Sequence, residues 1–243
     1  MSKMDHSGIE WIGFDLDDTL HFYRKASGCA SQAVYDYLNE EFGCDLDLLN
    51  SRYAVILREA QSRSFAEGKP SRVLRGERFG RLMAEFSILP HRHLDIVLDI
   101  YDAALARHLQ LKDGALEVLR ELKQSGFSIL VVSEGPHDAQ ETTLARLGLA
   151  PYVDLLITSG QEKRSKRDGL LKIALAKAGC APQSCVFIGD NMECDILPAL
   201  ALGMRAFYLG EDIQMPAGAE KLSSLADLPR FFSLAGTRPE PRA

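Results

Sequence analysis

The chain has 243 residues and a formal net charge of −6 at pH 7, with 46% hydrophobic and 26% charged residues. This length and composition indicate one large globular domain, or a core domain with a smaller insert, and exclude a fibrous or disordered chain. The acidic balance argues against a nucleic acid polymer or a membrane surface as the main partner, and no apolar run is long enough to cross a bilayer.

The two ends of the chain are polar. The N-terminal segment MSKMDHSG has no apolar stretch before Trp11, so we expect neither a secretory signal nor a transit peptide. We therefore expect a cytoplasmic protein, either a monomer or a homodimer. Residues 1–8 and 233–243, the latter ending in TRPEPRA, are expected to be flexible termini.

The first predicted element is a strand over residues 10–15, which leads directly into the acidic stretch DLDD. After it, and up to about residue 109, apolar residues recur at intervals of three and four positions, as in Ala33, Val34, Tyr37 and Leu38. This spacing is typical of amphipathic helices. We therefore expect this segment to be a helical insert without strands.

The pattern changes from about Lys112 onward to short β-rich apolar runs that alternate with amphipathic segments. Such runs are typical of parallel strands that are covered on both faces by helices. The predicted strands are residues 128–132, 154–157, 184–188 and 206–209, and the predicted helices lie near 114–124, 137–147, 168–178 and 192–202. The sequence thus predicts an α/β fold built on a parallel sheet.

Ligands of an open parallel α/β sheet bind beyond the carboxyl ends of its strands, and polar residues gather at those ends here. They are Asp15, Asp17, Asp18 and Thr19 after the first strand, Ser133, Glu134 and Gly135 after the second, the basic run 163–167 after the third, and Asp190, Asn191 and Asp195 after the fourth. Clustered carboxylates are tolerated mainly where a cation neutralises them or where a raised proton affinity is used. Mg²⁺ fits such oxygen ligands and leaves positions open for a phosphate.

The same residues support phosphoryl transfer in two steps. A carboxylate nucleophile with a second acid two residues further on provides both the attacking group and the proton. The hydroxyl of Ser133 and a lysine ammonium can hold the remaining phosphate oxygens.

The order of these residues resembles the four motifs of the haloacid dehalogenase (HAD) superfamily. Asp15-x-Asp17-x-Thr19 matches the first motif, Ser133 the second, a lysine the third, and Gly189-Asp190 with Asp195 the fourth. The helical block resembles the helical (C1-type) cap of the phosphoglycolate phosphatase and nucleotidase-like branch. The resemblance covers about residues 9 to 230. It implies a Rossmann-like core, formed by residues 9–20 and 110–232, and an all-helical cap domain over residues 21–109.

The resemblance also implies roles for individual residues. Asp15 becomes the nucleophile, and Asp17 becomes the general acid and then the base, with its backbone carbonyl on the metal. The Mg²⁺ ligands are then Asp15, Asp17 and Asp190, with Asp195 and Asn191 around them. The residues expected to contact the substrate are Leu16, Asp18, Thr19, Ser133, Glu134, Gly135 and Lys166.

Asp17 favours a phosphatase over a dehalogenase, because an alkoxide leaving group needs a proton and a halide does not. The sequence therefore predicts a Mg²⁺-dependent phosphatase of small phosphorylated metabolites that acts through an aspartyl-phosphate. A nucleoside monophosphate, phosphoglycolate and a sugar phosphate all stay open as substrates. The alternatives are a phosphotransferase or phosphomutase, a 2-haloacid dehalogenase, and a catalytically silent regulatory protein that senses phosphate.

Three positions depart from the family pattern. Asp18 stands where many members have glycine, and Glu134 stands where asparagine is more common and adds negative charge near the phosphate. The usual Lys-Pro pair of the third motif is missing. Lys166 matches the motif lysine best, and Lys163 is the alternative.

Two features of the insert admit two interpretations. Arg72, Arg75, Arg78 and Arg81 recur every three residues, which favours a solvated helix face; the alternative is that one of them binds a second anionic group of the substrate. The segment 21–23, just after the first motif, either contacts the leaving group or packs the hinge to the cap.

Overall fold

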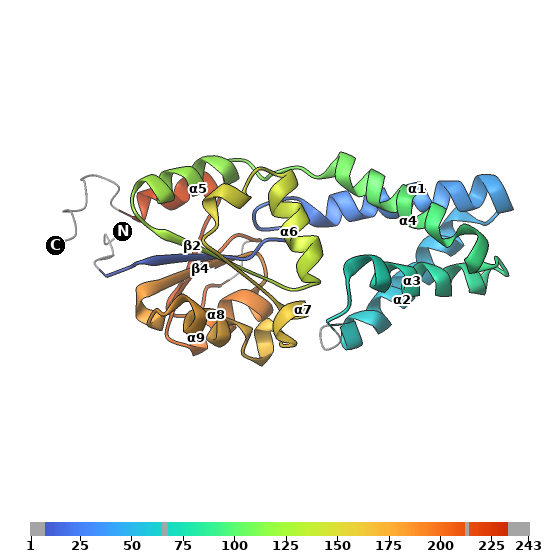
Figure 1. The fold of residues 1–243 in the computed structure, drawn as a ribbon. Coiled ribbons are helices and arrows are strands. Elements are labelled where there is room, and N and C mark those ends of the chain that lie inside the picture. The colour runs from blue at the N-terminus through green and yellow to red at the C-terminus, as the bar shows by residue number, and fades with distance from the viewer. Residues whose placement is uncertain (1–7, 65–67, 212–213, 233–243) are drawn as a thin grey trace.

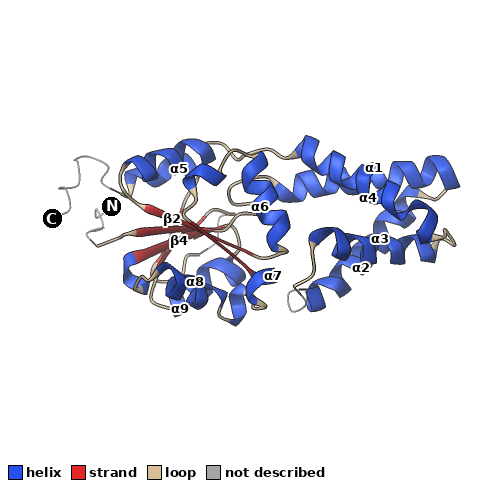
Figure 2. Cartoon of the chain, in the orientation of Figure 1, coloured by secondary structure: helices blue, strands red, loops and turns tan. Residues whose placement is uncertain are grey.

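The computed structural model describes residues 8–64, 68–211 and 214–232 of the chain, so the predicted flexible termini, apart from Gly8, lie outside the described residues. Its centre is a parallel sheet with the strand order β3-β2-β1-β4-β5-β6, flanked by helices (Figures 1 and 2). The strands are β1 Trp11–Phe14, β2 Ser128–Ser133, β3 Leu155–Thr158, β4 Cys185–Gly189, β5 Arg205–Tyr208 and β6 Ala219–Lys221. The predicted α/β fold with a parallel sheet is confirmed.

The two faces of the sheet carry separate hydrophobic cores, because successive side chains of a strand point to opposite faces. Ile12 and Phe14 of β1 belong to the core that is covered by α5 (Ala115–Gln124). The other face packs against α8 (Leu170–Ala178) and α9 (Leu197–Ala201). Gly13 faces that second core, where a Cβ atom would lie 2.7 Å from the ring of Phe187. The buried central strand thus fixes the position of the acidic stretch that follows it.

Two elements differ from the sequence-based expectations. β6 is not predicted, because it has three residues of intermediate burial and no apolar run. The helix predicted near 192–202 is a π-helical turn, Met192–Ile196, followed by α9. Pro198 lies in the first turn of α9, and proline lacks the N–H that would continue one hydrogen-bonded helix through this region.

Between β1 and α5 the described residues form four helices with a hydrophobic core of their own. They are α1 Tyr23–Phe42, α2 Leu46–Ser64, α3 Ser71–Glu85 and α4 Pro90–His108. Their shared core includes Val34, Phe79 and Val97, and the rings of Tyr53 and Phe79 stack with their centroids 4.7 Å apart. In Figure 1 these helices extend away from the sheet to one side. We infer that residues 21–109 form the cap domain that the sequence analysis proposes.

The two segments that connect the helical unit to the sheet run side by side. His21 pairs with both Asp17 and Leu111 in isolated β-bridges, and Phe22 N donates a 3.0 Å hydrogen bond to Gln110 O. The helical unit therefore joins the sheet at one double-stranded hinge, next to the acidic stretch. None of the helices formed by the described residues combines the length and apolar character needed to span a membrane.

Candidate active site

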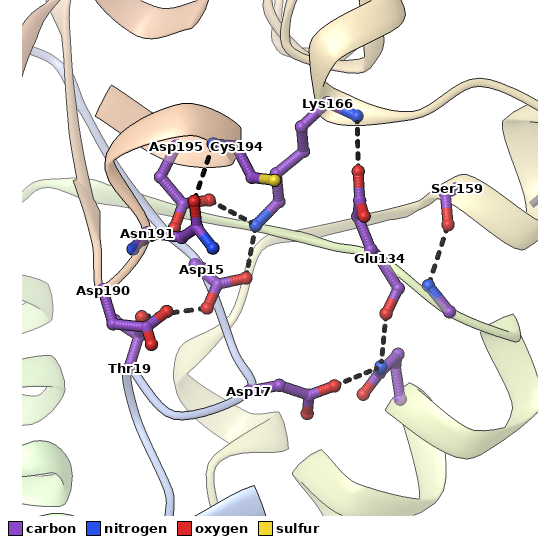
Figure 3. Close-up of polar contacts among 12 residues, drawn as sticks. Asp15, Asp17, Thr19, Glu134, Ser159, Lys166, Asp190, Asn191, Cys194 and Asp195 are labelled. Atoms are coloured by element: carbon purple, nitrogen blue, oxygen red, sulfur yellow. Dashed lines mark hydrogen bonds and ion pairs between the residues drawn. The ribbon is translucent and has the colours of Figure 1, made fainter. Parts of the chain in front are cut away.

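Asp15 lies at the carboxyl end of the central strand β1, and both of its carboxylate oxygens are engaged. Its backbone N–H donates to Ile188 O at 2.8 Å, which continues the pairing of β1 with β4. Oδ2 accepts a 2.9 Å hydrogen bond from Thr19 Oγ1, and Oδ1 accepts one from the ammonium of Lys166 (Figure 3). The residue as a whole is only 5% exposed. Asp15 is thus held in one orientation by a hydroxyl and a cation.

The loop after Asp15 is tight. Leu20 N donates to Leu16 O at 3.0 Å, and the Leu16 side chain is buried in the core. Asp18 has a φ of 60°, a left-handed conformation that glycine adopts without strain and that aspartate tolerates better than most residues. This explains the departure at position 18 in structural terms. The Asp18 carboxylate also accepts a hydrogen bond from Arg24 N at 3.1 Å, which supports the conformation.

Lys166 is buried between two carboxylates. Its Nζ lies 2.6 Å from Asp195 Oδ1 and also contacts Asp15. Burial alone would lower the pKa of Lys166, but the negative charges of Asp15 and Asp195 outweigh this effect and raise it, so the ammonium keeps its proton. Lys163, the alternative for the motif lysine, is exposed at the end of α7 (Ser159–Glu162). The structure therefore brings Lys166, and not Lys163, to the acids.

Glu134 fixes the loop that carries Lys166. Its Oε1 accepts a 2.9 Å hydrogen bond from Lys166 N, so this carboxylate positions the lysine in addition to placing negative charge near the site. Ser133 is fully buried, and its Oγ has no hydrogen-bond partner among the described residues. The N–H of Gly135 donates to Ser159 Oγ at 2.8 Å. The end of β2 thus supplies the Ser133 hydroxyl, which has no partner among the described residues, and the Glu134 carboxylate, which positions Lys166.

Three carboxylates gather at the ends of β1 and β4. Each of Asp15, Asp190 and Asp195 offers an oxygen within 4.8 Å of the others. Burial raises the pKa of Asp190 to about 6, and the nearby charge of Asp15 adds to this effect. The three carboxylates repel one another and need a cation to offset their charge. Hard oxygen donors of this kind are the ligands that Mg²⁺ prefers. The residues present therefore fit a divalent cation.

Asp195 reaches this cluster because the chain folds back after β4. Asn191 Oδ1 accepts hydrogen bonds from the N–H groups of Glu193 and Cys194, both at 3.0 Å, and Asn191 N donates to Asp195 Oδ2 at 3.0 Å. Gly189 leaves room for this arrangement, since a Cβ atom there would lie 2.4 Å from the Asp195 side chain. Asn191 thus acts as the cap of the π-helical turn.

The carboxylate of Asp17 lies outside this three-acid cluster. Its Oδ1 pairs with His21 Nε2 at 2.9 Å, and its Oδ2 accepts a 3.2 Å hydrogen bond from Gln140 Nε2. Burial raises the pKa of Asp17, and the hydrogen bond with His21 only partly opposes it. Asp17 is thus separated from the other acids and favours its protonated form more than a free aspartate does.

Gln140 is a residue that the sequence analysis does not assign to the site, and His21 belongs to the segment 21–23, for which the sequence admits both leaving-group contact and hinge packing. Gln140 comes from α6 (His137–Arg146) and also donates to Glu134 O at 3.2 Å. Nothing in its surrounding sequence marks it, because its role depends on the packing of α6 against the sheet. His21 is fully buried, and its place directly after the acidic stretch is the one signal in the sequence.

A cavity of about 380 Å³ lies between the sheet edge and the helical unit. Asp15, Asp17 and Asp190 line it from the sheet side, and Tyr23, Arg75 and Arg78 line it from the helical side. Of the residues expected to contact substrate, Asp18, Glu134, Gly135 and Lys166 line the cavity, whereas Leu16, Thr19 and Ser133 lie behind it. Its volume falls at the lower end of the range of about 300–1,000 Å³ for small-molecule sites.

Known proteins are similar to this chain in sequence and in fold. Ribulose-1,5-bisphosphate 5-phosphatase of Halopiger xanaduensis is 30% identical over 199 residues, which cover 79% of this chain and 81% of that protein. Glyceraldehyde 3-phosphate phosphatase of Methanothermobacter thermautotrophicus is 28% identical over 212 residues, covering 84% and 87%. A 2-haloacid dehalogenase from Pseudomonas syringae superimposes with a TM-score of 0.71 at 22% identity, covering 93% of this chain and 98% of that one, which shows a common fold.

The family resemblance seen in the sequence motifs is confirmed over most of the chain. Residues 9–203 match the family model of haloacid dehalogenase-like hydrolases. This segment contains the sheet edge with its acids as well as the helical unit above it. The chain belongs to the haloacid dehalogenase-like hydrolase family.

Proposed function

We propose that the chain is a Mg²⁺-dependent phosphatase that hydrolyses a small phosphate monoester through an aspartyl-phosphate on Asp15. Both curated relatives named above are phosphatases, and the chain is a phosphatase of the same family. The observation that carries the detailed proposal is that the two acids of the first motif, Asp15 and Asp17, have different surroundings. Asp15 contacts the buried ammonium of Lys166, whereas Asp17 contacts His21 and Gln140 and has a raised pKa.

Asp15 acts as the nucleophile. Thr19 and Lys166 hold its carboxylate in one orientation at the edge of the cavity, so that little freedom is lost when it attacks phosphorus. An oxygen of Asp15 forms a bond to phosphorus while the bond from phosphorus to the alkoxide breaks. The product of this step is the aspartyl-phosphate and an alcohol.

Asp17 moves the protons. Its raised pKa favours the protonated carboxyl group that donates to the departing alkoxide, and the resulting carboxylate then takes a proton from the water that attacks the aspartyl-phosphate. This second displacement returns Asp15 and releases inorganic phosphate. His21 and Gln140 each hold one oxygen of Asp17 and orient the carboxyl group for both transfers.

The remaining polar groups neutralise and hold the phosphoryl group. Lys166 is a protonated cation at the nucleophile, and the unpartnered hydroxyl of Ser133 is a donor for a phosphoryl oxygen after a small shift. Mg²⁺ would be held by Asp15, Asp190 and the backbone carbonyl of Asp17, with Asp195 and Asn191 around them, and would supply positive charge against the phosphate.

The test is phosphate release from a panel of nucleotide, sugar and short-acid phosphates. It compares the native chain with Asp15→Asn, with Mg²⁺ and with EDTA. We expect release that requires both the metal and Asp15. Retained release by Asp15→Asn would overturn the proposal, and halide release from 2-chloropropionate without phosphate release would favour the dehalogenase alternative.

A further inference from the structure

The wall of the cavity that faces the acids is basic. Lys69 lies just before α3, and Arg75 and Arg78 lie on it; all three line the cavity from the helical unit. No acidic side chain from the described part of that unit lines it. The carboxylates and the proposed metal site thus line the cavity from the sheet side, where Lys166 and Arg24 pair with them, whereas Lys69, Arg75 and Arg78 line it from the helical side.

The arginines of α3 divide into two pairs. Arg72 and Arg81 lie at 44% and 46% exposure and pair with acids of neighbouring helices, at 2.8 Å to Asp99 and 2.5 Å to Glu59. Arg75 and Arg78 lie between them on the helix. A step of three residues rotates a position by about 60° around a helix, so the first and last of these four positions lie about 180° apart and cannot share one face. The inner pair, Arg75 and Arg78, lines the cavity, whereas Arg72 and Arg81 do not.

Among the described residues, no acidic side chain pairs with Arg78. Arg75 pairs with Asp102 at 2.6 Å and lies over the ring of Tyr101, at 5.2 Å from the centroid. Lys69 pairs with Glu77 at 2.6 Å. The guanidinium of Arg78, in contrast, makes no hydrogen bond or ion pair to any described residue, and its Nε is buried without an acceptor.

An arginine N–H that is shielded from water and lacks an acceptor is unfavourable, and such groups normally have a partner. The planar fork of a guanidinium matches the two oxygens of a carboxylate or phosphate. The phenol of Tyr23 lies close to Arg78, and burial raises the pKa of Tyr23, so it stays a neutral hydroxyl that does not compete as an anion. The helical side of the cavity thus offers the N–H donors of Arg78 to an anion that would accept their hydrogen bonds.

We propose that Arg78, with Arg75 beside it, binds a second anionic group of the substrate. This inference rests on the proposed function, which places the phosphate to be cleaved at Asp15. The substrate class is then a phosphate monoester on a short carbon chain that carries a carboxylate or a second phosphate at its other end. A cavity of about 380 Å³ accommodates a molecule of that size.

The test uses two pairs of esters that differ in one charged group. 3-Phosphoglycerate and glycerol 3-phosphate differ by a carboxylate against a hydroxymethyl group, and ribulose 1,5-bisphosphate and ribulose 5-phosphate differ by a phosphate. The initial rate of phosphate release with Mg²⁺ gives kcat/KM for the native chain, Arg78→Met and Arg81→Met. Arg81 lies on the same helix but outside the cavity, which makes it the matched control.

We expect the native chain to prefer the anionic member of at least one pair. Loss of a charge-assisted hydrogen bond should lower kcat/KM for that member by about 10- to 100-fold in Arg78→Met. The neutral member should change by less than about threefold, and Arg81→Met should keep the native preference. Arg78→Lys, which keeps the charge, should restore part of the preference. The pair with the larger dependence on Arg78 identifies the anion as carboxylate or phosphate.

Equal losses for both members of each pair in a folded Arg78→Met, or no native preference, would overturn the inference while leaving the phosphatase intact. If no ester is hydrolysed, calorimetric titration of Asp15→Asn with the same four esters decides the question separately. If Asp15→Asn binds the anionic member of a pair more tightly than the neutral member, and adding Arg78→Met removes this difference, the inference is kept and the proposed function is refuted. Equal binding of all four would refute the inference.

Discussion

The ammonium nitrogen of Lys166 lies 2.6 Å from Oδ1 of Asp195 and contacts Asp15 as well, so one buried cation is shared by two buried carboxylates. Lys166 is 3% exposed and Asp195 is 1% exposed. A buried charged side chain is energetically tolerated only while groups of opposite charge pair with it. The nucleophile, the lysine and the acid of the fourth motif therefore form one electrostatic unit, and removing any member affects the other two.

Lys166→Met should destabilise the chain. The substitution leaves the carboxylates of Asp15 and Asp195 buried without their cation, which typically costs about 3–5 kcal/mol of the free energy of unfolding. Urea denaturation at pH 7 in EDTA measures it, and added Mg²⁺ should restore part of the loss. Lys163→Met, at an exposed position, should change the free energy by less than about 0.5 kcal/mol. Equal stability of the two variants would contradict the assignment of Lys166.

Asp17→Asn should act selectively on esters with poor leaving groups. General acid catalysis contributes about 10²- to 10⁴-fold, and an alkoxide needs the proton far more than a nitrophenolate does. The expected loss in kcat is therefore above about 100-fold for glycerol 3-phosphate and much smaller for p-nitrophenyl phosphate. The ratio of the two rates, measured for native chain and variant, reports the role of Asp17. The same loss on both esters would show that Asp17 is not the proton donor.

Asp190 should make the metal-free chain less stable as the pH rises. Its pKa is raised from 3.8 to about 6, so the folded state binds this proton more tightly than the unfolded chain, and the stabilisation is lost between about pH 4 and pH 6. After allowance for screening at a side chain that is 14% exposed, the loss is about 2 kcal/mol.

Asp190→Asn tests this dependence. In EDTA at pH 7 the variant should be more stable than the native chain by about 2 kcal/mol, and near pH 4 the difference should nearly disappear. Saturating Mg²⁺ should stabilise the native chain more than the variant, because only the native chain keeps the third carboxylate of the cluster. If Asp190→Asn is less stable than the native chain at pH 7 in EDTA, the claim that the acid cluster needs a cation is contradicted.

The strand-end acids could be predicted from the sequence, because a parallel sheet brings the carboxyl ends of its strands to one edge whatever the details of packing. Asp15 and Asp190 follow neighbouring strands, and their carboxylates meet as expected. The position of Asp17 within two residues of Asp15 does not reveal that its carboxylate turns the other way. Its orientation depends on His21 and Gln140, which reach it through the hinge and α6.

The arginine pattern shows the same limit. Spacing alone favoured a solvated face, and this holds for Arg72 and Arg81, which are exposed and paired with acids. Arg75 and Arg78 line the cavity, a placement that depends on tertiary packing and that spacing alone does not reveal. β6 is not predicted from the sequence for a similar reason, because this short edge strand is defined by its pairing with β5 and not by its own residues.

A hydrogen-bonded contact outside the hinge segments ties the helical unit to α6. Asp138, in the first turn of α6, accepts hydrogen bonds from Ser71 N at 3.1 Å and Ser71 Oγ at 2.7 Å, at the start of α3. Asp138→Ala should weaken closure over the cavity and raise KM by about tenfold, with a smaller effect on kcat, because bonds to a charged acceptor are lost. Steady-state kinetics measures both constants. Glu141→Ala on the same helix is the control, and an unchanged KM in Asp138→Ala would argue against the contact as a latch.

The central claim is that hydrolysis passes through an ester of Asp15 and not through direct attack of water on the substrate. Two successive displacements at phosphorus restore its configuration, whereas one displacement inverts it. The most direct measurement is the stereochemical course of hydrolysis, with a substrate that is made chiral at phosphorus by oxygen isotopes and thio-substitution. The account predicts retention of configuration. Inversion would contradict it, because it would leave Asp15 without the role of nucleophile.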